Sequence, residues 1–226
     1  MRIWSNSFAN GTVMPAACAF AVRDAATHVR LSNNRNPHIA WADVPNGTES
    51  LVLVCHDPDV PRDGRRANVD GCTVPLTAPR IHFFHWTLAD IPVCLTALAE
   101  GRFSNCVTPH GKPGPLVPFI IKNGTEHQLR HGLNDYTDWF AGAPGMAGEF
   151  YGYDGPCPPW NDPKPHRYCF TLYALDIESL TVPTMFYGND VLAAMEGHVM
   201  ASATLTGVYT LDPSVAPVQV GSTTAT

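Results

Sequence analysis

The residues best suited to chemistry in this chain are two aspartates that follow an apolar run. Residues 50–61 read Ser-Leu-Val-Leu-Val-Cys-His-Asp-Pro-Asp-Val-Pro, and the first half has the composition of a strand buried on both faces. Because the prolines at 58 and 61 remove backbone donors, we expect this strand to end before Asp57. Asp57 and Asp59 would then lie in a rigid loop at the strand end. Such loops often hold functional sites, although aspartates also cap ordinary turns.

Histidines in two later segments add to this pair of carboxylates. The run from His82 to Asp90 predicts a second strand, in which His82 and His85 point to opposite faces unless a bulge intervenes. His85 is flanked by aromatic residues that would wall a pocket. A third strand opens at His166, directly after a loop rich in Gly and Pro, whose backbone N–H groups would suit an anion.

The composition predicts the elements that must position these residues. A chain of 226 residues with 21 prolines, 18 glycines and 15% charged residues is typical of one mostly β domain, spanning 1–226, with short strands and many turns. We expect residues 102–150 to form an extended loop region and residues 213–226 to form a frayed tail. Smaller elements are also predicted, namely a hairpin about Asn123-Gly124, a short helix at 134–140, a helix capped by Asn189 or Asp190, and a last strand at 204–211.

Charge and cysteine usage exclude several classes of protein. The net charge is -6 and there is no basic block, which argues against a nucleic-acid partner. The number of cysteines is odd, at seven, and no Cys-x-x-Cys pair occurs, which argues against a structural zinc site. The sequence shows no secretory signal and no run of about 18 apolar residues. We therefore expect a protein of the reducing cytoplasm without a transmembrane segment, a metal or a cofactor.

Four short motifs together resemble a known family. In chain order they are Asp57-Pro-Asp-Val-Pro61, Phe84-His85-Trp86, Gly155-Pro-Cys-Pro-Pro159 and His166-Arg167-Tyr168. This combination resembles the phosphatidylethanolamine-binding protein family, also called Raf kinase inhibitor protein-like, in its bacterial and archaeal branch. The resemblance extends from Trp4 to Leu211. It implies an antiparallel β-sandwich with a few short helices and a small anion-binding pocket.

The resemblance also implies roles for individual residues. Carried over by motif position, the ligand-binding residues would be Asp57, His85, Gly155, Pro156, His166 and Tyr168. Asp59, Pro61 and Arg167 would be structural, with an ion pair between Arg167 and Asp59.

The chemistry of these side chains is compatible with a phosphate group. Histidine and tyrosine can donate hydrogen bonds to phosphate oxygens. Asp57 would orient a histidine and favour its imidazolium form, or it would meet the ammonium of an ethanolamine head group. Phosphate binding is then expected to strengthen as the pH falls from about 8 toward 6.

The sequence therefore predicts a binding protein for a phospholipid head group or a phosphorylated small molecule, and not an enzyme. The alternative is a protein-interaction module that inhibits a kinase or a peptidase, as the resemblance implies. The sequence does not decide whether the chain forms a homodimer. A hydrolase is less favoured because no Gly-x-Ser-x-Gly elbow exists and Cys157 is the only tempting nucleophile. A metal-dependent enzyme built from Asp57, His85 and His166 has suitable ligand types, but the resembling family is not one of metalloenzymes.

Overall fold

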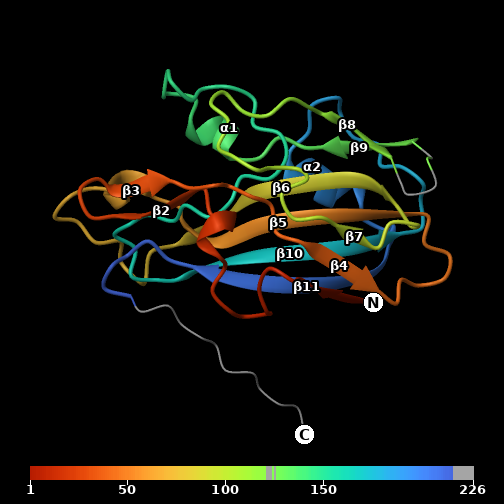
Figure 1. Cartoon of the computed structure of the whole chain (residues 1–226), viewed down its shortest axis with the longest axis horizontal. Helices are drawn as coiled ribbons and strands as arrows, with labels where there is room; N and C mark the ends of the chain where they lie inside the picture. Colours follow the sequence, from red (N-terminus) through yellow and green to blue (C-terminus); the bar gives the residue numbers. More distant parts are fainter. Residues whose placement is uncertain (121–123, 125, 216–226) are drawn as a thin grey trace, which may run out of the picture.

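Four long strands, of 10 to 13 residues each, form the centre of the molecule. The computed structural model describes residues 1–120, 124 and 126–215 (Figure 1). A six-stranded sheet has the order β11-β10-β5-β6-β9-β8, and its neighbouring strands are antiparallel. Its strands are β5 (Ser50–Pro61), β6 (Arg80–Pro92), β8 (Leu116–Ile120), β9 (Glu126–His131), β10 (His166–Leu175) and β11 (Val199–Tyr209). The predicted class, mostly β with antiparallel sheets, is confirmed.

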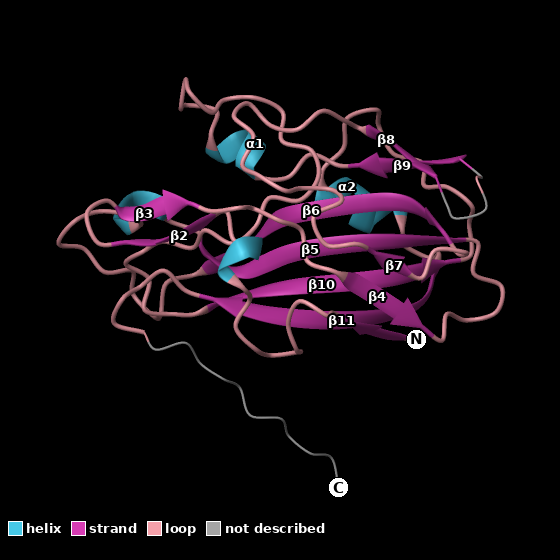
Figure 2. Cartoon of the chain, in the orientation of Figure 1, coloured by secondary structure: helices cyan, strands magenta, loops and turns pink. Residues whose placement is uncertain are grey.

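Smaller elements cover this sheet (Figure 2). A three-stranded sheet of order β1-β4-β7 lies over one face, and β2 pairs with β3 in a separate hairpin. These strands are β1 (Arg2–Trp4), β2 (Ala21–Asp24), β3 (His28–Leu31), β4 (Ile39–Ala42) and β7 (Ala97–Leu98). The helices are short, namely η1 (Ala16–Cys18), η2 (Gly64–Arg66), α1 (Tyr136–Trp139) and α2 (Gly188–Ala194).

The apolar run of β5 is buried on both faces, as its composition predicts. Leu51 and Leu53 belong to the larger core cluster between the two sheets, which also contains Trp41 of β4. Val52 belongs to a smaller cluster on the opposite face, which Val191 of α2 covers. Alternate side chains of one strand therefore contribute to two separate cores.

The expectation that β5 ends before Asp57 is wrong, because the strand continues to Pro61. Two features accommodate the prolines. Among the described residues, β10 pairs with β5 only as far as His56, so the later part of β5 has a free edge on that side. On the other side, the register against β6 shifts between Asp57 and Val60, which is the signature of a bulge. Proline is tolerated at edges and bulges because no ladder hydrogen bond is lost there.

Within the region 102–150, the structure contains the hairpin β8–β9 and the helix α1, close to the predicted hairpin about Asn123-Gly124 and the predicted helix at 134–140. The hairpin pairs Ile120 with Glu126, and most of its turn lies outside the described residues. The residue at the N-cap of α2 is Tyr187, and Asp190 accepts a hydrogen bond from its backbone N–H. The last strand begins earlier than predicted, at Val199. Of the predicted tail, residues 216–226 lie outside the described part. Within the described residues, no helix is long and apolar enough to cross a membrane.

Candidate functional site

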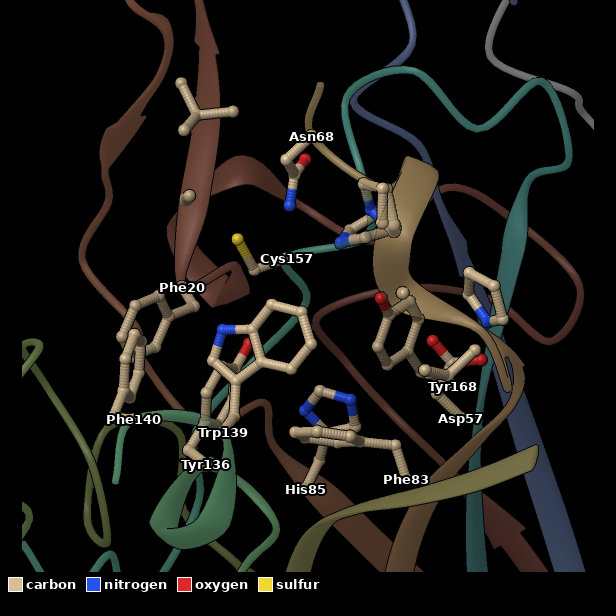
Figure 3. Close-up of a pocket in the computed structure, with 18 of the residues that line it drawn as sticks. Phe20, Asp57, Asn68, Phe83, His85, Tyr136, Trp139, Phe140, Cys157 and Tyr168 are labelled. Atoms are coloured by element: carbon tan, nitrogen blue, oxygen red, sulfur yellow. The ribbon is translucent and has the colours of Figure 1, made fainter. Parts of the chain in front are cut away.

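A cavity of about 400 Å³ lies where β5, β6 and β10 meet the hairpin β2–β3, η2 and α1 (Figure 3). Its volume falls in the range of small-molecule pockets. His85, Asp57 and Tyr168 lie near one another at one end, whereas Phe20 and Phe140 lie at the other. The cavity thus has a polar end and an aromatic end.

His85 of β6 faces this cavity, on the same side of the strand as Phe83, and a bulge lies next to it. The register against β5 pairs Phe84 with His56 and Trp86 with Cys55, so His85 is an additional residue between them. Phe84 packs in the outer cluster, whereas Trp86 lies in the main core. Because of the extra residue, His85 and Trp86 both face the interior. His82 remains on the outer face, where its ring stacks on that of His56 at 4.8 Å.

The hydrogen bonds of His85 determine its tautomer. Its Nδ1 lies 2.7 Å from the carbonyl oxygen of Asp154, so Nδ1 carries the proton and donates it. Burial lowers the pKa of His85 to about 4, against the smaller opposing effect of Asp57. The ring is therefore neutral at physiological pH, and Nε2 is an acceptor for which the described residues offer no partner.

His166 is protonated where His85 is neutral, and it does not line the cavity. Its Nδ1 lies 2.6 Å from Asp57 Oδ2 and its Nε2 lies 3.1 Å from Asp162 Oδ2, so both ring nitrogens are occupied. Burial alone would lower the pKa of His166, but the two carboxylates outweigh burial and raise it to about 9. Asp57 does stabilise an imidazolium, as expected, but that imidazolium is His166 behind the pocket wall and not His85.

Tyr168 supplies a second polar group at this end, and its hydroxyl forms no hydrogen bond with the described residues. It follows the exposed Arg167 on β10, is itself buried and lines the cavity. Its ring meets that of His85 edge-on at 5.1 Å. Burial holds the pKa of Tyr168 well above its usual value, so the hydroxyl stays neutral and can donate a hydrogen bond.

The loop residues expected to contact the ligand instead hold the loop in place. Neither Gly155 nor Pro156 is among the residues that line the cavity. The N–H of Gly155 donates to Asn34 Oδ1 at 2.7 Å, and a Cβ at this position would lie 2.0 Å from the carbonyl oxygen of Cys18. The carbonyl of Pro156 accepts from the N–H of Phe20 at 2.9 Å. These contacts position the aromatic wall, so Gly155, Pro156 and also His166 support the site without lining it.

The residues expected to be structural do hold the end of β5. Asp59 is buried and accepts from Arg167 Nε at 2.8 Å and Nη2 at 2.9 Å, so the expected ion pair is present. Lys164 Nζ adds a contact at 2.7 Å. Burial alone would raise the pKa of Asp59, but Arg167 and Lys164 hold it well below its usual range. Pro61 also forms part of the cavity wall.

The aromatic end was missed from the sequence. Phe20 stacks on Tyr136 at 4.6 Å, and Tyr136 stacks on Phe140 at 5.5 Å. Trp139 also lines the cavity and is 52% exposed. The signal was available, because Tyr136, Trp139 and Phe140 have the i, i+3, i+4 spacing that places side chains on one face of a helix.

The two catalytic alternatives gain no support from this geometry. Cys157 lines the cavity, but burial raises the pKa of its thiol to about 12, which disfavours the nucleophilic thiolate. Asp57, His85 and His166 do not form an open set of metal ligands, because both nitrogens of His166 are occupied. In the part of the chain that the structure describes, no group of three His, Cys, Asp or Glu side chains has metal-binding geometry.

Comparison with known proteins identifies the family. The family model described as phosphatidylethanolamine-binding protein matches residues 4–210. The chain belongs to this family. It is 31% identical over 212 residues to a protein of Aquifex aeolicus named UPF0098 protein, covering 94% of this chain and 90% of that one. It is 30% identical over 177 residues to UPF0098 protein YbhB of Escherichia coli, covering 78% and 82%.

Solved structures support the same conclusion. A putative phosphatidylethanolamine-binding protein homologue from Chlamydia trachomatis is similar to this chain with a TM-score of 0.58 and 26% identity, over 92% of this chain and 95% of that one. Escherichia coli YbcL, titled a new member of the mammalian family, has a TM-score of 0.61 at 24% identity, over 92% and 97%, and supports the fold. The four motifs that indicated the family each contribute at least one residue to the lining of the cavity.

Proposed function

We propose that the protein binds a phosphate-containing small molecule or lipid head group in the cavity, as a binding protein and not as an enzyme. The observation that carries this proposal is the polar end of the cavity. The acceptor Nε2 of His85 and the hydroxyl of Tyr168 are both available to a ligand there, beside the carboxylate of Asp57. Its opposite end is walled by aromatic rings, which suits a ligand with a polar head and an apolar body.

The charge states define which form of phosphate fits. A neutral His85 accepts a hydrogen bond, so the ligand must donate one. A phosphate monoester that carries one proton can donate its O–H to Nε2, while its remaining oxygens accept from the hydroxyl of Tyr168. The nearby carboxylate of Asp57 disfavours a dianion, because like charges repel. An ammonium group on the same ligand would be attracted by Asp57.

The expected direction of the pH dependence is unchanged, but its cause is the protonation of the ligand and not that of a histidine. Phosphate monoesters have a second pKa of about 6, so the monoanion becomes more abundant as the pH falls from 8 toward 6. Binding therefore strengthens over this range through protonation of the ligand, because His85, with a pKa of about 4, stays neutral throughout. A phosphodiester head group has no such proton, and its binding should be flat over the same range.

Calorimetric titration tests the proposal. Phosphoethanolamine, inorganic phosphate and glycerophosphoethanolamine, which is a diester, would be titrated between about pH 6 and 8, the range that spans the second phosphate pKa. The monoester and diester arms distinguish a free phosphorylated molecule from a lipid head group. His85→Ala should weaken binding at least about tenfold, since one buried hydrogen bond to a charged group contributes more than about 1.4 kcal/mol.

The matched control is His82→Ala, which removes a histidine from the exposed face of the same strand and should leave the affinity unchanged. Equal binding by wild type and His85→Ala would refute the assignment of the polar end. Absence of binding by the wild type to all three compounds would refute the proposed function. The alternative of a module that inhibits a kinase or peptidase would then be preferred.

A further inference from the structure

A buried polar cluster adjoins the loop that contacts His85, and the proposed ligand contacts do not use it. Asp154 is fully buried, and its Oδ1 accepts hydrogen bonds from Lys112 Nζ at 2.7 Å and from Asn34 Nδ2 at 2.6 Å. Its Oδ2 accepts from Asn134 Nδ2 at 2.9 Å. We call Asn34, Lys112, Asn134 and Asp154 the Asp154 cluster. None of the four lines the cavity, so an effect of the cluster on a ligand must pass through another residue.

Lys112 supplies the charge that balances Asp154. Within the described residues Asp154 forms one ion pair, with Lys112, whose side chain is only 14% exposed. Burial raises the pKa of the Asp154 carboxyl, and the Lys112 ammonium is the largest of the effects that oppose this rise. Removing one partner of a buried ion pair leaves the other charge uncompensated. Lys112 is therefore needed to keep the carboxylate of Asp154 ionised and in its place.

The backbone of Asp154 bonds to His85 twice. Its N–H donates to the carbonyl oxygen of His85 at 3.0 Å, and its own carbonyl oxygen lies 2.7 Å from His85 Nδ1. Asn34 fixes the direction of that carbonyl, because its Oδ1 accepts from the N–H of Gly155 at 2.7 Å. The peptide bond between Asp154 and Gly155 is trans, so its C=O and its N–H point in opposite directions in one plane. With the N–H held toward Asn34, the carbonyl points toward His85.

We propose that the Asp154 cluster selects the tautomer of His85, with Asn34 and Lys112 as positioning residues. A carbonyl oxygen can only accept a hydrogen bond, so His85 keeps its proton on Nδ1 and presents the lone pair of Nε2 to the cavity. The site then favours a ligand that donates a hydrogen bond, such as a phosphate monoester with one proton, over the fully ionised form. This preference rests on the proposed function, whereas the tautomer is a property of the free protein.

Other titratable side chains surround His85 but do not bond to its ring. They are Asp57 and His56 on β5, His166 and Tyr168 on β10, Tyr136 on α1 and Cys157 in the loop before β10. Within the described residues, the carbonyl of Asp154 is the one hydrogen-bond partner of the His85 ring. His131, whose pKa Lys112 also helps to lower, accepts from Trp86 Nε1 and does not contact that carbonyl. The tautomer of His85 is therefore decided at Asp154.

Nitrogen-15 NMR of the histidine rings tests the proposal without a ligand, with the signals of His85 assigned by their loss in His85→Gln. In the wild type at neutral pH, His85 should carry its proton on Nδ1 and none on Nε2. Lys112→Met leaves the carboxylate of Asp154 without its cation, and His85 should then show a mixture of tautomers. Lys112→Arg keeps a cation and should keep the wild-type tautomer. A wild type with the proton on Nε2, or a folded Lys112→Met with the wild-type tautomer, would overturn the proposal.

The matched control is Lys164→Met. Lys164 Nζ lies 2.7 Å from Oδ1 of the buried Asp59, which is a similar ion pair, but Asp59 does not bond to the ring of His85. This variant should leave the tautomer unchanged, and a mixture of tautomers in it would show that any nearby ion pair has the same effect and would overturn the proposal. Should Lys112→Met fail to fold, Asn34→Gly suits the positive φ of 51° at this position, releases the N–H of Gly155 and should also give the mixture.

The pH profile of phosphoethanolamine binding separates positioning from a general loss of structure. In the wild type the affinity should rise from pH 8 to 6 with the monoanion, whose fraction increases about fiftyfold for a second pKa of about 6. In Lys112→Met a protonated Nε2 also accommodates the dianion, so most of this rise should disappear. Weaker binding with an unchanged profile would indicate a merely structural role and overturn the proposal. A wild type that binds no ligand would refute the proposed function, while the NMR result still decides the role of the cluster.

Discussion

Raising the pH should destabilise this protein because the buried imidazolium of His166 is lost. Its pKa is about 9 in the folded chain against an ordinary value of 6.5, and the cause is its position between Asp57 and Asp162. A group whose pKa is raised by folding contributes stability that is fully present below the unfolded pKa and disappears as the pH rises through the folded pKa. For His166 this window lies between pH 6.5 and about 9.

The magnitude follows from proton linkage. Within the window the folded state holds one more proton than the unfolded state, so the free energy of unfolding should fall by about 1.4 kcal/mol per pH unit. Across the whole window this amounts to about 3 kcal/mol, which is a large fraction of the stability of a typical domain. Buried histidines with lowered pKa values, such as His85 and His131, act in the opposite sense below pH 6.5. Stability should therefore be greatest near neutral or slightly acidic pH.

The assay is urea unfolding in the presence of a reductant, at intervals between about pH 6.5 and 7.5, which stays about one pH unit below the ordinary thiol pKa of about 8.5. Asp162→Asn removes one of the two carboxylates and should make the slope shallower. The control His198→Gln removes an exposed histidine that is paired with Asp176 and should leave the slope unchanged. Should Asp162→Asn fail to fold, an NMR titration of the wild-type imidazoles provides the check. Stability that is flat or rises from about pH 6.5 to 7.5, or an imidazole of His166 that titrates near 6.5, would refute the reasoning.

Three further predictions concern the supports of the cavity. Asp59→Ala removes a buried carboxylate that accepts hydrogen bonds from Arg167 and should cost about 2 kcal/mol in urea unfolding, the contribution of hydrogen bonds to a charged group. The exposed Arg167 regains water, so no charge is left buried, and a cost below about 1 kcal/mol, that of a surface pair, would contradict the prediction. Gly155→Ala should destabilise by more than about 1 kcal/mol through overpacking, because its Cβ would meet the carbonyl of Cys18 at 2.0 Å; an unchanged melting temperature would show that the loop relaxes. At pH 8, Cys157 should react with maleimide far more slowly than the exposed cysteines, because burial raises its pKa to about 12; mass-spectrometric mapping that finds it first would exclude this environment.

Local sequence patterns were enough to predict the strands and the family. The apolar run of β5 and the largely aromatic and apolar run of β6 reflect the burial of these strands. The end of β5 was mispredicted because a proline stops a strand only where its missing N–H would have paired with a neighbouring strand. In β5, the prolines lie where one edge is unpaired and the pairing with β6 is bulged. Alternation along β6 correctly predicted that His82 and His85 lie on opposite faces, but the bulge that lets Trp86 face the interior together with His85 is not shown by the sequence.

The motifs identified which side chains gather around the cavity, because motif order and spacing are properties of the chain itself. Only the tertiary structure decided what each of them does. His85 and His166 are the same residue type in similar motifs, yet one is a neutral acceptor facing the cavity and the other is an imidazolium sealed behind it. The difference arises because burial and nearby carboxylates act in opposite directions on a histidine pKa, and their balance depends on contacts between residues far apart in sequence, such as Asp57 and His166.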